Sequence, residues 1–255
     1  MNRIILLVGV LLLTWGCHRD DGFTLEGTLE HGAGKTLYIE ELSPDGPVFL
    51  DSLRLDDDGH FTYRCKMPYQ TFYNLHCSPV DYVVLLPRLG ERIAVSGDFQ
   101  SLQWSYHVTG SEESTLLWQL QDYCNYGISV LQEIVDKDQD NRTRYGADSK
   151  AYQEAKAETD SVFREAAAEQ GEYVSHFIQE HKGSLATLIA LYKQFNRHDL
   201  LSPETNFDYY ELVLEGLEEA LPDNPHTIQF KNHVENLRHR YGKPREALDM
   251  VFDGQ

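Results

Sequence analysis

The chain has 255 residues, with 41 acidic and 22 basic side chains and a formal net charge of −19 at pH 7. This acidity argues against binding to nucleic acid and against peripheral binding to anionic lipid, because both partners would repel the chain. Hydrophobic residues make up 41% of the sequence, an ordinary share for a globular protein, so wholesale disorder is also excluded.

The N-terminal segment predicts export and lipid attachment. Arg3 precedes an unbroken apolar run from Ile4 to Leu13, and Gly16 stands directly before Cys17. A charged start followed by a short apolar run is typical of a secretory signal peptide. The run is far shorter than the roughly 20 residues that a membrane-spanning helix needs. We therefore predict a lipoprotein signal peptide and lipobox over residues 1–17, with Cys17 as the lipidated residue. The alternative is an ordinary cleaved signal in which Cys17 is incidental.

A short tether over residues 18–22 follows the predicted lipidation site. The predicted location is the outer membrane, on its periplasmic face or at the cell surface. Asp20 and Asp21 leave both orientations open. Acidic residues directly after a lipidated cysteine resemble a signal for export to the cell surface. The alternative is that they only form a solvated tether, which carries no information about orientation.

Residues 23–111 have the pattern of an all-β domain. Short runs alternate apolar and polar residues with period two, and Gly-, Pro- and Asp-rich turn signals separate them. Clear examples are residues 36–40, 60–64, 72–76 and 92–96. Such runs at spacings of about ten residues predict an antiparallel sandwich or barrel-like domain.

After Gly110 the period changes to about 3.6 residues, which predicts helices. The expected helices span residues 113–135, 150–181, 185–195, 203–221 and 227–241. The polar interval 136–149 lacks an apolar stripe and is predicted to be a charged loop. These elements form an all-α domain over residues 112–242, before a C-terminal tail over 243–255. The predicted fold class is α+β.

Three cysteines follow Cys17, namely Cys65, Cys77 and Cys124, and none forms a CxxC motif. An odd number leaves at least one free thiol. If the strands around Cys65 and Cys77 meet at a turn near residues 68–70, Cys65 faces Tyr73 instead of Cys77. We therefore predict free cysteines that act as small hydrophobic residues.

No local motif specifies a reaction, a cofactor or a metal. Asp56–Gly59 has a hint of a calcium loop, but Met67 stands where an acidic ligand is needed, so a turn is predicted. The histidines lack the i, i+4 spacing of helical zinc ligands, and no GxSxG motif is present. We predict scattered surface histidines, no catalytic residue, no cofactor and no metal ligand.

Aromatic residues are abundant in the β half and are expected to fill its core. Several exposed together would instead indicate a surface that stacks on sugars or anchors a partner. The residues concerned are Tyr69, Phe72, Tyr73, Tyr82, Trp104 and Tyr106.

Diffuse motifs along the chain resemble a known family. The β half is similar to the domain of unknown function 4369, which precedes a thioredoxin-like module in many Gram-negative lipoproteins. The helical half resembles the connecting region of those proteins. The residues that carry the resemblance are 23–27, 35–39, 51–53, 59–63, 82–86, 93–98 and 108–111, followed by 177–178 and 184–188.

The resemblance implies a thioredoxin-like domain of the TlpA and ResA type after the helical region, with a CxxC motif that this sequence lacks. We expect a natural short form of the family, with a truncated gene as the alternative. The predicted function is that of a membrane-anchored, non-catalytic module that binds an envelope protein or a glycan. The alternative is an accessory or truncated form of a thiol-disulfide oxidoreductase.

Overall fold

A computed structural model describes residues 21–241. Strands dominate the first half of the chain and helices the second, which confirms the predicted α+β class. The elements of the first half are β1 (Gly22–Glu30), β2 (Thr36–Ser43), β3 (Gly46–Arg54), β4 (His60–Lys66), β5 (Phe72–Ser78), β6 (Asp81–Leu85), β7 (Arg92–Asp98), α1 (Leu102–Ser105) and β8 (His107–Thr109). Those of the second half are α2 (Glu112–Tyr145), α3 (Lys150–Glu180), α4 (Ala186–Leu191), β9 (Gln194–Phe195), β10 (His198–Asp199), α5 (Phe207–Ala220) and α6 (Pro225–Tyr241).

The first half forms a sandwich of two four-stranded sheets. Sheet A has the strand order β4-β1-β7-β8, and sheet B has the order β3-β2-β5-β6. Alternate residues of each strand point between the sheets, where Leu25 and Ile93 of sheet A share a buried core with Ile39 and Leu75 of sheet B. Both sheets are open among the described residues, so the sandwich form of the prediction is correct and the barrel form is not.

One strand pair differs from the antiparallel prediction, because β1 and β7 are parallel. The chain leaves sheet A after β1, builds β2 and β3 in sheet B, and returns to sheet A with β4 on the other side of β1. A parallel pair needs such a long connection, and residue alternation does not reveal it. The expected facing of Cys65 and Tyr73 across one hairpin is also wrong, because β4 and β5 belong to different sheets.

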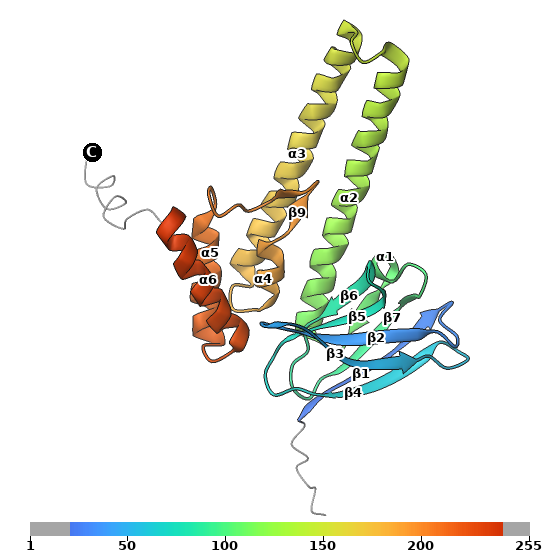
Figure 1. Cartoon of the computed structure of the whole chain (residues 1–255), viewed down its shortest axis with the longest axis vertical. Helices are drawn as coiled ribbons and strands as arrows, with labels where there is room; N and C mark the ends of the chain where they lie inside the picture. Colours follow the sequence, from blue (N-terminus) through green and yellow to red (C-terminus); the bar gives the residue numbers. More distant parts are fainter. Residues whose placement is uncertain (1–20, 242–255) are drawn as a thin grey trace, which may run out of the picture.

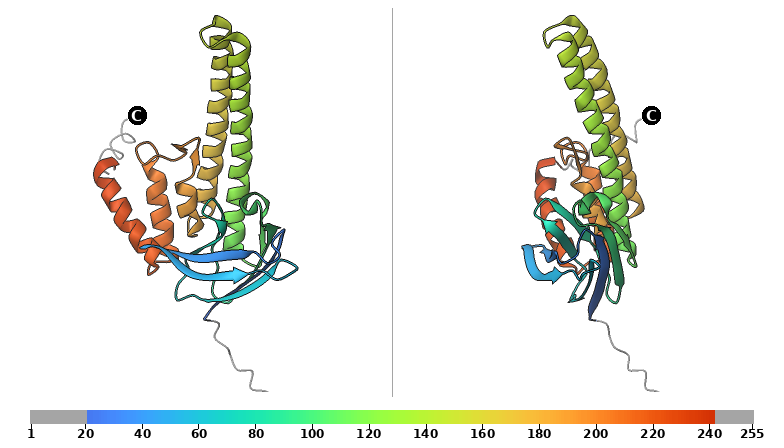
Figure 2. Two further views of the ribbon diagram at one scale, coloured as in Figure 1. Left: turned by 45° about the vertical axis from the view of Figure 1, so that its right-hand side comes forward. Right: turned by 90° about the vertical axis from the view of Figure 1, so that its right-hand side faces the viewer.

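The second half packs its helices against sheet B, and α2 also contacts β8 of sheet A. Phe72 and Leu86 from the β half join a buried cluster with Leu117 of α2, Phe177 of α3 and Val213 of α5. In Figure 1, α4, α5 and α6 stand side by side above the sandwich, whereas α2 and α3 form a long arm that rises beyond them. Both views in Figure 2 show the arm projecting from the body, at the end opposite the start of β1.

The predicted loop over residues 136–149 is wrong for its first ten residues, because α2 continues to Tyr145. Contacts with α3 replace the missing apolar stripe. The Tyr152 hydroxyl donates to both carboxylate oxygens of Asp138 at 3.3 and 3.2 Å, and Lys137 pairs with Glu158 at 2.9 Å. A neighbouring helix therefore stabilises a stretch whose own sequence looks like a loop.

Other boundaries in the helical half also differ from the prediction. The helix expected over residues 185–195 ends at Leu191, and β9 then pairs with β10 in a small hairpin inside the otherwise helical half. The helix expected from residue 203 begins at Phe207, and the last helix begins at Pro225 instead of Thr227. Proline suits the first helical turn, because its missing N–H has no partner there.

Candidate functional site

The only site residue predicted from the sequence, Cys17, lies outside the described residues, as do the rest of the signal peptide and most of the tether. None of the helices formed by residues 21–241 is both long enough and apolar enough to cross a membrane.

The outer face of sheet A carries an open hollow of about 550 Å³. Strand register places its outward side chains in two rows that cross all four strands. The upper row contains His60, Thr28, Ser96 and His107. The lower row contains Thr62, Glu26, Ala94 and Thr109. The hollow is defined by these eight residues, with Gly27, Phe61 and Val95 beneath them.

Small side chains occupy three of the four central positions of the hollow, and imidazole rings stand at its border. Ala94 and Ser96 lie on β7 and Thr28 lies on β1, the two central strands, whereas His60 and His107 lie on the edge strands β4 and β8. His60 is held by a 2.6 Å hydrogen bond between its Nδ1 and Thr28 Oγ1. The rings of His107 and of Trp118 in α2 pack edge to face, with their centroids 4.5 Å apart. Both imidazoles are therefore positioned by neighbouring side chains.

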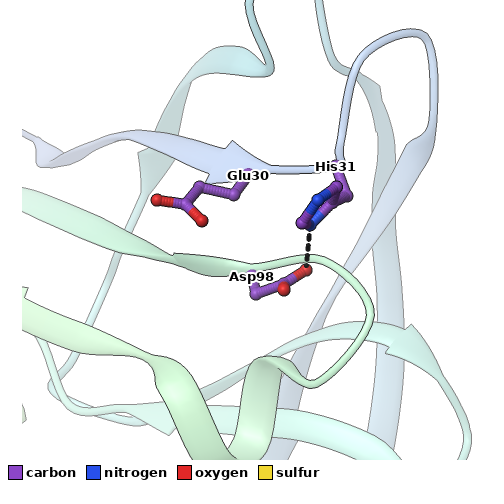
Figure 3. A group of neighbouring side chains, drawn as sticks. All are labelled: Glu30, His31 and Asp98. Carbon is purple, nitrogen blue, oxygen red and sulfur yellow. Dashed lines mark hydrogen bonds and ion pairs between the residues drawn. The ribbon is translucent and has the colours of Figure 1, made fainter.

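Ion pairs and acidic groups lie at the two ends of this face. At one end, Arg92 Nη1 donates to the Glu26 carboxylate at 2.7 Å, which balances the one acidic side chain of the hollow. At the other end, where β1 and β7 finish, Glu30, His31 and Asp98 come together (Figure 3). The one carboxylate of the hollow is thus paired with a cation, and the other acidic groups of this face lie beyond the hollow.

The group of Glu30, His31 and Asp98 places one donor atom of each side chain within 4.8 Å of the other two. Three such donors match the usual protein contribution to an open zinc site. Asp98 Oδ1 already has hydrogen-bond partners, however, because it accepts from the Gln100 N–H at 2.9 Å and contacts His31 Nδ1 at 3.1 Å. The Gln100 N–H, followed by His31, lowers the pKa of Asp98. We assign the group no role beyond these contacts.

The predicted aromatic residues divide between core and surface. Phe72, Tyr73 and Tyr106 are buried, as expected, and Tyr69 is half-buried. Tyr82 and Trp104 are exposed instead. Tyr82 lies on the outer face of sheet B, in register with His76, which is in register with the exposed Tyr38 on the far side. Two exposed tyrosines, separate from the hollow, therefore flank His76, whose own side chain is only 15% exposed.

Asp56–Gly59 forms a turn, as predicted. The Asp56 carboxylate accepts hydrogen bonds from the backbone N–H groups of Asp58 and His60 at 2.9 and 2.8 Å. These bonds lower the pKa of Asp56, the bond from His60 most strongly. Gly59 adopts a φ of 78°, which favours glycine. The turn sets the position of His60 at the border of the hollow.

Cys65, Cys77 and Cys124 are free, as predicted. Burial raises the pKa of all three thiols, that of Cys77 to about 12. A raised pKa lowers the fraction of thiolate, which is the reactive form in thiol-disulfide exchange. These three side chains therefore have the environment of structural cysteines.

Sequence patterns did not reveal the hollow. Its residues come from four strands that span 84 positions, from Glu26 to Thr109, and the parallel pairing of β1 with β7 brings them together. The available signal was the alternation of Thr and Ser with apolar residues, for example at Thr24-Leu25-Glu26 and His60-Phe61-Thr62. Alternation identifies the outward face of each strand but not the neighbouring strand. Comparison of the chain with models of protein families gives no match, and neither does comparison with curated protein sequences.

Proposed function

We propose that this protein is a lipid-anchored, non-catalytic binding module of the cell envelope and that the hollow on sheet A is its ligand site. The observation that carries the proposal is the double row of side chains across β4, β1, β7 and β8, of which all but Ala94 can form hydrogen bonds. The hydroxyl groups of Thr62, Ser96 and Thr109 form no hydrogen bond with any described residue. They are thus available to a ligand.

The chemistry of the hollow favours binding over catalysis. Its one hydroxyl–imidazole contact, between Thr28 and His60, lies on an open surface, and both residues are accessible to solvent. Enzymes stabilise charge with preorganised dipoles in sites from which water is excluded. An open, hydrated face supports reversible recognition instead.

The redox alternative receives no support from the thiols. An accessory to thiol-disulfide exchange needs an exposed thiol of low pKa. The raised pKa values of the three described cysteines disfavour that role. The resemblance to the domain of unknown function 4369 supports a location in the cell envelope. It does not support a particular reaction.

The anchor in this proposal is the lipid on Cys17. In the described part of the chain, β1 begins at the end of the molecule opposite the tip of the α2–α3 arm (Figure 2). Anchoring through the segment before β1 therefore directs the arm away from the membrane. The outer face of sheet A then stays accessible beside the anchor.

The test separates anchoring from binding. Anchoring is followed by fractionating membranes from cells that produce the full chain or the Cys17→Ala variant, which we expect to be released. Binding is followed by immobilising the purified full chain and exposing it to a detergent extract of the envelope of the producing bacterium.

The variant Ser96→Trp fills the centre of the hollow, and Thr24→Trp is its matched control, because Thr24 lies on the same face of β1 outside the hollow. We expect capture of envelope material to be lost in Ser96→Trp and retained in Thr24→Trp. Equal capture by both variants would show that the hollow is not the ligand site.

A further inference from the structure

The hollow presents hydrogen-bonding groups on a regular grid. Adjacent strands lie about 4.8 Å apart, and outward residues of one strand repeat every ~6.8 Å. In the upper row, Thr28 and Ser96 stand between two imidazoles. In the lower row, Thr62 and Thr109 lie at the ends. A matching ligand carries donors and acceptors at similar short intervals along an extended surface.

Charge narrows the class of ligand. The only carboxylate in the hollow, that of Glu26, is neutralised by Arg92 at 2.7 Å. No lysine or arginine lines the hollow to attract an anion, and the whole chain carries a net charge of −19, which repels one. The grid therefore suits an uncharged ligand.

The shape of the hollow argues against a peptide strand and against an apolar ligand. Extended peptides usually add to the edge of a sheet through main-chain hydrogen bonds, but the hollow lies on a sheet face whose central strands are already paired on both sides. Apolar ligands prefer enclosed pockets lined mainly by apolar side chains. This hollow is open, and hydroxyl, imidazole and carboxylate groups are interspersed with apolar surface in its lining.

The methyl groups of the hollow also fit the surface of a sugar ring. Ala94 and the threonines place small apolar patches between the hydroxyl groups, and the two imidazole rings stand at opposite edges. Alternating C–H faces and hydroxyl groups are the surface of a pyranose ring. A volume of about 550 Å³ falls in the range of small-ligand sites, which is about 300–1,000 Å³.

We infer that the hollow binds a neutral oligosaccharide, whose hydroxyl groups bond to Thr28, Thr62, Ser96 and Thr109 while its rings lie between His60 and His107. The inference rests on the proposed function and specifies the ligand class of the same site. The inference places the sugar site on sheet A and not at Tyr38, His76 and Tyr82, whose aromatic rings lie on sheet B.

The test is isothermal titration calorimetry of the purified full chain in a detergent without a sugar headgroup. The probes are three neutral trisaccharides, namely chitotriose, cellotriose and maltotriose, with tri-galacturonate as an anionic comparison. We expect at least one neutral trisaccharide to bind and tri-galacturonate not to bind. Binding of the anionic sugar alone, or of none of the four, would overturn the inference.

Variants then locate the binding. Thr109→Val keeps the side-chain shape and removes a hydroxyl group without a described partner, so we expect affinity to fall about fivefold. Ser96→Trp should abolish binding, whereas Thr24→Trp and Tyr82→Ala should leave it unchanged. Loss of binding in Tyr82→Ala but not in Ser96→Trp would move the site to sheet B and contradict the inference.

The two proposals fail in distinguishable ways. If no trisaccharide binds but Ser96→Trp still loses envelope capture, the hollow is a ligand site for another chemical class. If Ser96→Trp retains envelope capture, the proposed function itself fails.

Discussion

The imidazole of His226, in the first turn of α6, shares a 2.8 Å hydrogen bond with the hydroxyl group of Thr71, directly before β5. The two residues are 155 positions apart, and both are buried. Next to them, the Asn224 side chain donates to the Gln70 carbonyl oxygen at 2.8 Å. These contacts join the last helix to the sandwich, so the two halves of the chain meet through buried polar groups as well as through their shared apolar cluster.

The His226 contact predicts a pH dependence of stability. Burial lowers the pKa of His226 from 6.5 to about 4. Between these pH values the unfolded chain binds a proton that the folded chain does not. The free energy of unfolding therefore does not depend on His226 protonation above pH 6.5. As the pH falls from 6.5 toward 4, it decreases by at most about 1.4 kcal/mol per pH unit, because protonation of His226 favours the unfolded chain. Urea unfolding of the wild type and of His226→Gln across this range measures the effect, and parallel stability curves would contradict it.

A partly buried ion pair should stabilise the junction between the β6–β7 loop and α2. Arg88 Nη2 donates to the buried Glu113 carboxylate at 2.6 Å, and the Ser184 hydroxyl donates to the other oxygen of that carboxylate. Arg88→Ala leaves Glu113 buried without a cation, and we expect a loss of about 2 kcal/mol in the free energy of unfolding. Half of the Arg88 side chain is exposed, which keeps the loss below that of a fully buried pair.

The matched control for Arg88 is Arg92→Ala, which breaks the exposed pair with Glu26. Exposed pairs contribute about 1 kcal/mol or less. Equal losses in the two variants, measured by urea unfolding, would show that the burial of Glu113 has no energetic consequence.

Two glycines with similar backbone angles should respond differently to alanine. Gly59 has a φ of 78°, and an added Cβ would lie 2.3 Å from the Leu29 carbonyl oxygen. Gly34 has a φ of 66°, but its nearest neighbour would be Arg54 Nη2 at 3.8 Å. We expect Gly34→Ala to cost about 1 kcal/mol from backbone strain alone. Gly59→Ala should cost about 3 kcal/mol, because the clash is with backbone. It should also weaken trisaccharide binding, since the turn at Gly59 positions His60.

Thiol titration tests both the three cysteines of the described residues and the anchor. Burial raises the pKa of Cys65, Cys77 and Cys124, so we expect slow reaction with a thiol-reactive disulfide at pH 7 in the folded protein. In concentrated urea, three of the four cysteines should react rapidly, because lipidation blocks Cys17. A fourth reactive thiol in protein purified from membranes would contradict lipidation. Rapid reaction in the folded state would contradict the structural role of the other three.

Period two in residues 36–40, 60–64, 72–76 and 92–96 correctly located four strands, because the alternation of side chains is a local property of extended chain. The helix predicted over residues 150–181 agrees with α3 within one residue at its C-terminal end. The interval 136–145 was predicted wrongly, because its helix depends on Lys137 and Asp138 meeting α3. His226 was predicted to lie on the surface, and contact with the distant Thr71 buries it.

The sequence by itself determined that strands dominate the first half and helices the second, the turn at Asp56–Gly59 and the absence of a CxxC motif, all of which depend on neighbouring residues. The tertiary structure decided which strands pair and therefore where the hollow lies. Thr28, Ser96, His60 and His107 become one row only when β1 lies between β4 and β7 and β7 pairs with β8. The physical reason is that strand register results from packing the whole sandwich around one core, whereas alternation along a strand specifies only which face each residue takes.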